Sequence, residues 1–163
     1  MPAPGLAQYQ HLRFSWDGQP APGTGGNILI PGFVISGSGA EQLLVRGDGP
    51  SLAAFGVSGV LAAPSLKVFD NTGSSIASNT GWGTASNPAQ IAATAALVGA
   101  FALPSGSADC AQIVSLPAGA YTMQISGTGE TTGVALAEVY EVEVPQAQPA
   151  NDPERPVAVR LSR

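Results

Sequence analysis

Apolar and polar residues alternate along most of this chain in short stretches that glycine- and proline-rich turns separate. The clearest stretch spans residues 116–142 and opens with a turn at 116–119. After the turn, three large apolar side chains share one face of a predicted strand: Tyr121, Met123 and Ile125. A Gly-Thr-Gly loop follows at 127–129, and the alternation resumes over 134–141. The pattern predicts a β-hairpin, which needs a second layer to bury its apolar face.

Other short apolar runs, each bounded by turn residues, predict further strands. They lie at 12–16, 28–35, 41–46, 65–69, 74–78, 101–103 and 110–116. Pro31 lacks an amide proton, so the run at 28–35 is expected at a sheet edge or a bulge, before a glycine-rich turn at 36–39. The unbroken apolar run 43–45 predicts a strand that is buried on both faces. Turn residues at 70–73 join the runs on either side of them into a second hairpin.

Two segments depart from the alternating pattern and predict helices. Pro50 is well placed to begin a single helical turn that Gly56 ends, with Leu52 and Phe55 on the core. The one regular helix is predicted at 87–98. There Asn87 is the expected cap, Pro88 takes the first helical position and Gly99 follows the end, so that the core-facing residues are Ile91, Ala95 and Val98.

The composition assigns these elements to a fold class. The chain has 21 glycines and 14 prolines, concentrated between the apolar runs, which argues against long helices and is typical of an all-β protein. We therefore predict a two-sheet antiparallel β-sandwich of the jelly-roll kind, with one short helix near 87–98 and extended terminal arms. Its expected parts are an N-terminal arm at 1–10, the sandwich domain at 11–144, a proline-rich linker at 145–156 and a C-terminal strand or tail at 157–163.

Charged residues make up only 10% of the chain, so uncharged polar residues and glycine must cover most of its surface. The net charge is −5, and half of the 6 basic residues stand near the end of the chain: Arg155, Arg160 and Arg163. No basic patch is left for nucleic acid, which excludes that partner. No apolar run approaches the length of a membrane span and no secretory leader is recognisable, so we expect no membrane insertion and, for an exported protein, a leader already removed.

His11 and Cys110 are the single histidine and the single cysteine, and neither has the neighbours of a catalytic residue. His11 stands beside Arg13 in the N-terminal part and is expected at a surface or a sheet edge. Cys110 has apolar surroundings and no basic neighbour that would lower its pKa, so we expect a buried, unreactive thiol. We therefore predict no catalytic residue, no cofactor and no enzymatic activity.

Four aspartates stand in stretches rich in turn-forming residues: Asp17, Asp48, Asp70 and Asp109. Carboxylates in such loops can bind calcium, but none of these stretches has the alternating ligands of a calcium loop. We interpret the four as turn-forming residues and predict no metal site. Arg46-Gly47-Asp48 is the tripeptide of some integrin ligands, yet three residues recur by chance too often to indicate that function.

Trp82 and Asn79 are the candidates for binding a ligand. They stand in a loop rich in Asn and Gly, where an exposed tryptophan could stack on a sugar ring. The alternative interpretation is that Trp82 packs over the open end of the sandwich. The first interpretation predicts a carbohydrate-binding or adhesion module with a polysaccharide as its partner.

The last residues of the chain carry a strand pattern of their own. Residues 145–156 are rich in proline and are expected to form a stiff, extended spacer. Beyond the spacer, apolar residues recur at every second position: Val157, Val159 and Leu161. A strand tethered in this way can return to its own sheet or add to the sheet edge of another molecule. The expected self-association residues are these three and the apolar residues of the first predicted strand: Leu12, Phe14 and Trp16.

Several stretches of the chain resemble a known kind of module. They are 27–37, 44–57 with the sequence LVRGDGPSLAAFGV, 76–82, 99–104 and 116–142. Together they are similar to a β-sandwich module, jelly-roll-like and more loosely like pre-peptidase C-terminal domains, that occurs in tandem in large secreted or cell-surface bacterial proteins. The resemblance implies an extracellular or cell-surface location and brings no catalytic residues. In the tandem arrangement a linker joins the last strand of one module to the first strand of the next, and residues 157–162 look like that first strand.

These patterns predict a non-enzymatic structural protein that self-assembles into a homo-oligomer or polymer. Its terminal strand would be exchanged between subunits as a donor strand, giving an extracellular filament, lattice or coat. Two alternatives stay open. One is a carbohydrate-binding or adhesion module of a secreted protein, and the other is a virion structural protein of the capsid, decoration or tail. A hydrolase ranks below both, since it would need a cleft that joins His11 or two carboxylates.

Overall fold

A computed structural model describes residues 11–15 and 28–142 of the chain. Six strands form one antiparallel sheet in the order β1-β6-β2-β5-β3-β4. The strands are β1 (His11–Ser15), β2 (Gly32–Asp48), β3 (Pro64–Phe69), β4 (Ser75–Asn79), β5 (Cys110–Gly127) and β6 (Leu136–Val142). Three helical segments accompany them: the 3-10 helices η1 (Pro50–Phe55) and η2 (Trp82–Thr84), and the α-helix α1 (Pro88–Leu97). The prediction of an all-β fold with one short helix is confirmed.

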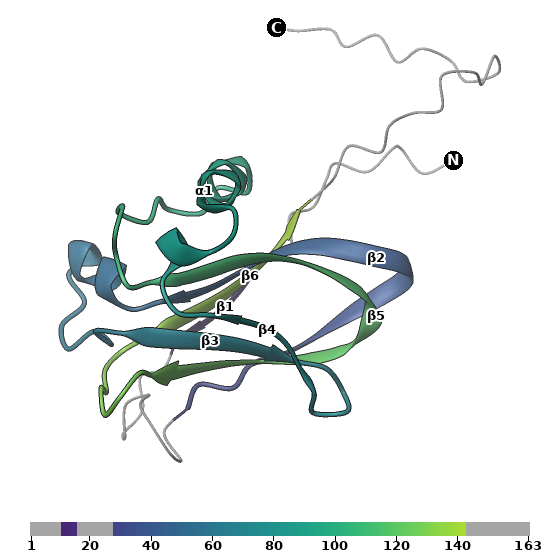
Figure 1. Cartoon of the computed structure of the whole chain (residues 1–163), viewed down its shortest axis with the longest axis horizontal. Helices are drawn as coiled ribbons and strands as arrows, with labels where there is room; N and C mark the ends of the chain where they lie inside the picture. The colour runs from purple at the N-terminus through teal and green to yellow at the C-terminus, as the bar shows by residue number, and fades with distance from the viewer. Residues whose placement is uncertain (1–10, 16–27, 143–163) are drawn as a thin grey trace, which may run out of the picture.

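The two longest strands, β2 and β5, bend sharply and run through both layers of the molecule (Figure 1). Their pairing register shifts between Ile35 and Ala40 of β2. Within this irregularity Gly37 and Gly39 have φ angles of 105° and 115°, a conformation that residues with a Cβ atom rarely adopt. Residues 36–39, predicted as a turn between strands, are therefore a bend inside one continuous strand.

The bend folds the single sheet into two layers. The helix-covered layer contains β1, β6, residues 40–48 of β2 and residues 110–117 of β5. The open layer contains residues 32–35 of β2, residues 119–127 of β5, β3 and β4. The predicted sandwich of two separate sheets is not confirmed, because the hydrogen bonds join all six strands and the layers share β2 and β5.

The predicted hairpin over 116–142 is wrong, although both of its strands exist. β5 pairs with β2 and β3, whereas β6 pairs with β1 and β2. Residues 128–135 carry the chain from the open layer to the helix-covered layer and pass close to Val60 and Leu61, with Leu61 donating its amide to the carbonyl of Val134 at 2.8 Å. The alternation of residues specifies which face is buried but not which strand becomes the neighbour.

Apolar side chains fill the space between the two layers. This core includes Phe33, Leu43, Val45, Leu66, Val68, Met123 and Ile125. Leu44, between two core residues, points to the other face and packs with Trp82, Ile91 and Tyr140 in a second apolar cluster. The run 43–45 is thus buried on both faces, as its unbroken apolar sequence predicts.

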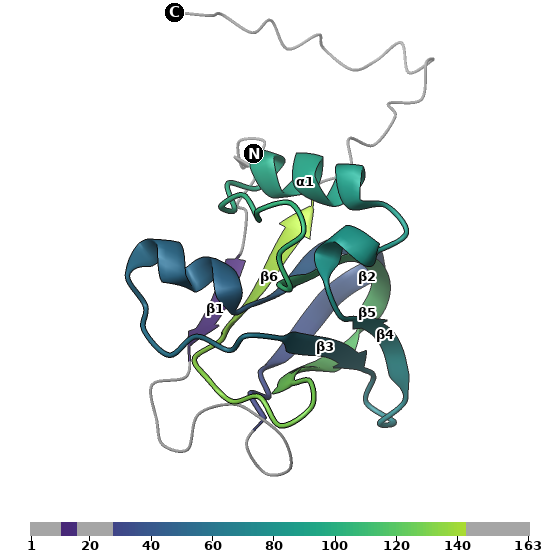
Figure 2. The ribbon, with the colours of Figure 1, turned by 60° about the vertical axis from the view of Figure 1, so that its left-hand side comes forward.

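Helix α1 covers the outer face of the helix-covered layer (Figure 2). Ile91 and Ala95 are buried against that layer and Val98 packs beside them, which confirms the predicted face of the helix. Asn87 begins the helix, but its side-chain amide donates to the carboxamide oxygen of Gln90 rather than to a backbone group. The open layer has no such cover in the part of the chain that the structure describes, and Val34 on its outer side is 73% exposed.

The remaining local predictions have mixed outcomes. The β3–β4 hairpin and the turn at 70–73 are confirmed, as is the helical turn that begins at Pro50 and ends at Gly56. Leu52 is buried as expected, but Phe55 is 63% exposed and packs edge-on against Phe101, with ring centroids 4.9 Å apart. The predicted strand at 101–103 is wrong: this segment is a loop, because the backbone carbonyl of Phe101 bonds a side chain instead of a neighbouring strand.

Candidate functional site

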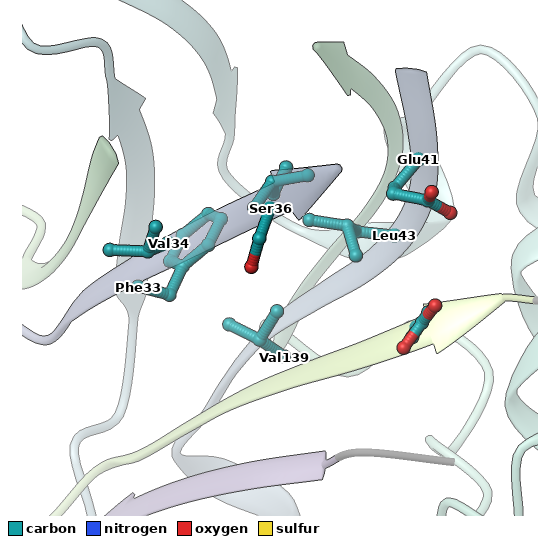
Figure 3. Close-up of a pocket in the computed structure, with 8 residues that line it drawn as sticks. Phe33, Val34, Ser36, Glu41, Leu43 and Val139 are labelled. Carbon is teal, nitrogen blue, oxygen red and sulfur yellow. The ribbon is translucent and has the colours of Figure 1, made fainter. Parts of the chain in front are cut away.

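A groove opens between the two layers, next to the bend of β2. It has a volume of about 230 Å³ and is lined by both halves of β2 and by β6. The lining residues are Phe33, Val34, Ile35, Ser36, Glu41, Leu43, Val139 and Glu141. Figure 3 shows Glu41 at the opposite end of the groove from Phe33, with Ser36 and Leu43 between them. The groove is therefore apolar where Phe33, Leu43 and Val139 line it and acidic at the end that Glu41 and Glu141 line.

A strand edge that has no partner among the described residues runs along this groove. Leu29 and Ile125 exchange both of their backbone hydrogen bonds, at 3.0 and 2.9 Å. In an antiparallel ladder such pairs alternate, so the backbone groups of every second residue, among them Gly32 and Val34, point away from β5. In the described part of the chain β5 is the sole strand paired with residues 32–35. We call this side of residues 30–36 the open edge.

A second candidate is a buried polar cluster under the loop that precedes β5. Arg46 and Glu138 are direct cross-strand partners on β2 and β6, and their side chains lie 3.5 Å apart. The Arg46 guanidinium also donates to Asp48 Oδ1, at 3.1 and 3.3 Å, and to the carbonyl of Phe101 at 2.9 Å. It lies 4.2 Å from the centroid of the Phe101 ring, and Tyr140 donates its hydroxyl to Glu138 at 2.9 Å.

Asp109 extends this cluster to helix η1. Its Oδ1 accepts the amides of Gly49 and Ser51, at 2.8 and 3.2 Å, and its Oδ2 accepts the Ser51 hydroxyl. The backbone carbonyl of Asp109 accepts the amide of Trp82 at 2.7 Å. Asp109 therefore joins η1, η2 and the start of β5. The prediction that Asp48 and Asp109 are turn-forming residues is wrong, because both side chains are fully buried. Asp109 accepts hydrogen bonds from residues 49 and 51, which are distant in sequence, and Asp48 ends β2 and accepts hydrogen bonds from Arg46.

The buried cluster holds more carboxylates than cations. Burial is the main cause that raises the pKa of Asp48 well above its ordinary value, and the nearby carboxylate of Glu138 adds to the shift, while Arg46 opposes it. The cavity beside Arg46 is small, about 90 Å³, and its other lining residues are apolar, Trp82, Ile91 and Leu103 among them. The cluster thus lies against apolar walls, and its arrangement is that of a structural network that locks η1 and the loop before β5 onto the sheet.

This raised pKa predicts how stability depends on pH. The folded protein holds a proton on Asp48 more tightly than the unfolded chain, so this contribution to stability is complete below about pH 4 and is lost as the pH rises through the folded pKa. We expect the melting temperature to fall from pH 5 to pH 8, and Asp48→Asn to reduce that fall. Asp70→Asn is the control, because the Thr72 hydroxyl and the backbone amides of Ser74, Thr72 and Gly73 lower the pKa of the exposed Asp70. Titration of Asp70 therefore affects stability only at lower pH. A wild-type melting temperature that is constant or rises across this range would contradict the assignment.

Trp82 and Asn79 are not placed as exposed ligand-binding residues would be. The Trp82 ring is buried under α1, and its indole N–H donates to the carbonyl of Pro104 at 3.1 Å. Asn79 is buried too, and its amide group bonds the backbone of Gly81 and Ala111. Trp82 covers the outer face of the helix-covered layer rather than the open end of a sandwich. Neither residue offers a free surface for stacking on a sugar.

The other singled-out residues have structural surroundings. Cys110 is buried as expected, 3.1 Å from the carbonyl of Pro64, and burial raises its pKa to about 11, so the thiol stays protonated. Arg46 and Asp48 are buried, so the Arg-Gly-Asp tripeptide is not presented on the surface. The described residues contain no group of three His, Cys, Asp or Glu that could hold a metal ion. Asp70 accepts the backbone amides of Thr72 and Ser74, at 2.9 and 3.0 Å, in the turn predicted for it.

The structure places only part of the predicted self-association residues. Leu12 and Phe14 lie in β1, which forms one edge of the sheet and pairs with β6. Trp16, Asp17, the arm at 1–10, the linker at 145–156 and the strand at 157–163 lie outside the described residues. Sequence reasoning missed the groove, since Glu41 and Glu141 carry no signal until β2 and β6 are known to be neighbours.

Comparisons with known proteins add no relative to this picture. Neither a scan against known protein families nor a search of curated proteins finds a match to this chain. The resemblance to tandem β-sandwich modules of bacterial surface proteins therefore stays a prediction. Within the described residues, no helix is both long and apolar enough to cross a membrane.

Proposed function

We propose that this protein is a non-enzymatic structural subunit that self-assembles by donating a C-terminal strand to the sheet of a neighbouring subunit. The observation that carries the proposal is a strand edge with no partner among residues 11–15 and 28–142, beside the groove lined by Phe33, Leu43 and Val139. The sequence adds a predicted strand at 157–163 beyond a predicted proline-rich spacer. Exposed edges attract strands because their amides and carbonyls lack partners. The product would be a homopolymeric filament, lattice or coat outside the cell or at its surface, and a virion coat fits the same mechanism.

Donation to a neighbour is favoured over return to the same subunit by the spacer. Residues 145–156 contain four prolines, Pro145, Pro149, Pro153 and Pro156. At about 3.1 Å per residue an extended segment of this kind spans ~37 Å, more than the width of a small sheet. β6 ends at Val142, beside the acidic end of the groove, so a strand that returned antiparallel to residues 32–35 would need only a short turn and no long spacer.

The carbohydrate-binding alternative has no observation in its favour. It depended on Trp82 and Asn79, and both side chains are buried with backbone partners. We do not propose it as the function.

Deleting residues 145–163 is expected to convert assemblies into monomers, because it removes the donated strand and leaves every described element intact. Light scattering and electron microscopy measure the assembly state. A sharper pair of variants is Val159→Asp, which introduces a charge on the apolar face of the strand and should abolish assembly, and Ala158→Asp, which charges the opposite face and should not. Assemblies of unchanged size after the deletion would refute the proposed function.

A further inference from the structure

The open edge and its groove have a shape and charge that fit one segment of this chain. The edge offers the outward backbone groups of residues 30–36, and the groove beside it is lined by Phe33, Leu43 and Val139, all buried or nearly so. Its acidic end carries Glu41 and Glu141, each only partly buried. An occupant must therefore be a strand with an alternating apolar face and a basic residue at one end of that face.

Residues 157–163 have this pattern. Three apolar residues recur at every second position, Val157, Val159 and Leu161, and Arg163 follows on the same face. The order is apolar residues first and the cation last. Along β2 the groove is apolar beside Phe33 and acidic past Ser36, beside Glu41 (Figure 3). The two orders match when the strand runs parallel to the first half of β2.

We propose that the open edge is the acceptor site and that residues 157–163 of a second copy of this chain occupy it, parallel to residues 30–36. The apolar face of the donated strand packs under Leu43 and Val139, and Arg163 lies between Glu41 and Glu141. The added strand becomes a fifth member of the open layer and shields the backbone groups of Gly32 and Val34. This inference rests on the proposed strand donation and adds to it where the strand binds and in which direction.

The main test removes the backbone N–H of Val34, one of the donors that the open edge offers to an incoming strand. Val34→Pro keeps the pairing of β2 with β5, because the amide of residue 34 points away from β5, but it removes the hydrogen bond that an incoming strand would accept. We expect the dissociation constant of the full-length protein's self-association, measured by analytical ultracentrifugation, to rise about tenfold or more. Val34→Ala keeps the amide and is expected to change the constant less than about threefold. Circular dichroism confirms that both variants are folded.

A charge exchange tests the direction of the strand without relying on proline. Arg163→Glu places a third carboxylate beside Glu41 and Glu141 and is expected to weaken self-association about threefold to tenfold at low salt. Combining it with Glu41→Arg and Glu141→Arg is expected to restore the wild-type constant. Arg155→Glu, in the spacer, is the control and should have little effect.

The outcomes separate this inference from the proposed function. If deleting 145–163 abolishes assembly while Val34→Pro and Arg163→Glu leave it unchanged, the strand is donated elsewhere and the acceptor site is refuted. If the full-length protein is a monomer and Val34→Pro only lowers its stability, the occupant belongs to the same molecule and the second copy is refuted. Loss of assembly in Val34→Pro, together with recovery in the charge-exchanged variant, supports the site.

Discussion

Replacing Arg46 with methionine is expected to lower the free energy of unfolding by about 3–5 kcal/mol, because it leaves buried carboxylates without their cation. The guanidinium is fully buried and contacts Asp48, Glu138 and the carbonyl of Phe101 at once. Methionine matches its apolar volume but none of these contacts. Urea unfolding followed by circular dichroism measures the change. It is a large fraction of the free energy of unfolding of a typical domain, about 5–15 kcal/mol.

Arg46→Lys is the matched control for this prediction. Lysine keeps the charge, but its single ammonium group cannot donate to Asp48 and to the Phe101 carbonyl with the geometry of the planar guanidinium. The expected loss in the free energy of unfolding therefore lies between those of the wild type and the methionine variant. A methionine variant as stable as the wild type would show that the contacts of Arg46 in the buried polar cluster contribute nothing to stability.

The second large effect is expected for Asp109→Ala, at about 3–4 kcal/mol. The substitution removes the acceptor of the Gly49 and Ser51 amides and of the Ser51 hydroxyl, all of them buried. These donors hold helix η1 against the start of β5, so their loss should also expose the segment 49–56 to hydrogen exchange. Thermal unfolding measures the stability, and hydrogen exchange locates the opened segment.

Asp109→Asn separates the hydrogen bonds from the charge. The asparagine oxygen can still accept both backbone amides, so we expect a loss of about 1–2 kcal/mol and continued protection of 49–56. If alanine and asparagine variants lost equal stability, the negative charge rather than the accepted bonds would be the cause.

Local features of the fold follow from the sequence. The β3–β4 hairpin depends on Asp70, whose carboxylate bonds the turn that it begins, and helix α1 begins at Pro88 and ends just before Gly99. Neither element needs a distant partner to be recognised. The run 43–45 was predictable for a similar reason, since an unbroken apolar stretch must have both faces covered.

The non-local features do not follow from the sequence. β5 and β6 were expected to pair, but the chain crosses between the layers over 128–135, and the alternation within each strand is the same in both arrangements. The continuous bend of β2 depends on Gly37 and Gly39, whose positive φ angles serve a turn or a bend equally well.

The buried polar cluster was not predicted from the sequence. Asp48 was interpreted as a turn residue, whereas β2 continues to Asp48 and places it on the same face as Arg46. Glu138 lies directly across from Arg46, and the Phe101 ring lies against the Arg46 guanidinium; the first depends on strand order and the second on a loop distant in sequence. The groove could not be predicted for the same reason. Its acidic end forms only because β2 and β6 are neighbours, which brings Glu41 and Glu141 together.

The central claim is that one subunit donates residues 157–163 and another accepts them, and mixing two defective subunits tests it most directly. A chain without 145–163 can accept but not donate, whereas a Val34→Pro chain can donate but accepts a strand about tenfold more weakly or worse. At concentrations below the raised dissociation constant, neither should polymerise alone. Native mass spectrometry of the mixture, in which the two chains differ in mass, should show a 1:1 heterodimer that grows no further. Separate monomers in that mixture would contradict strand donation to the open edge.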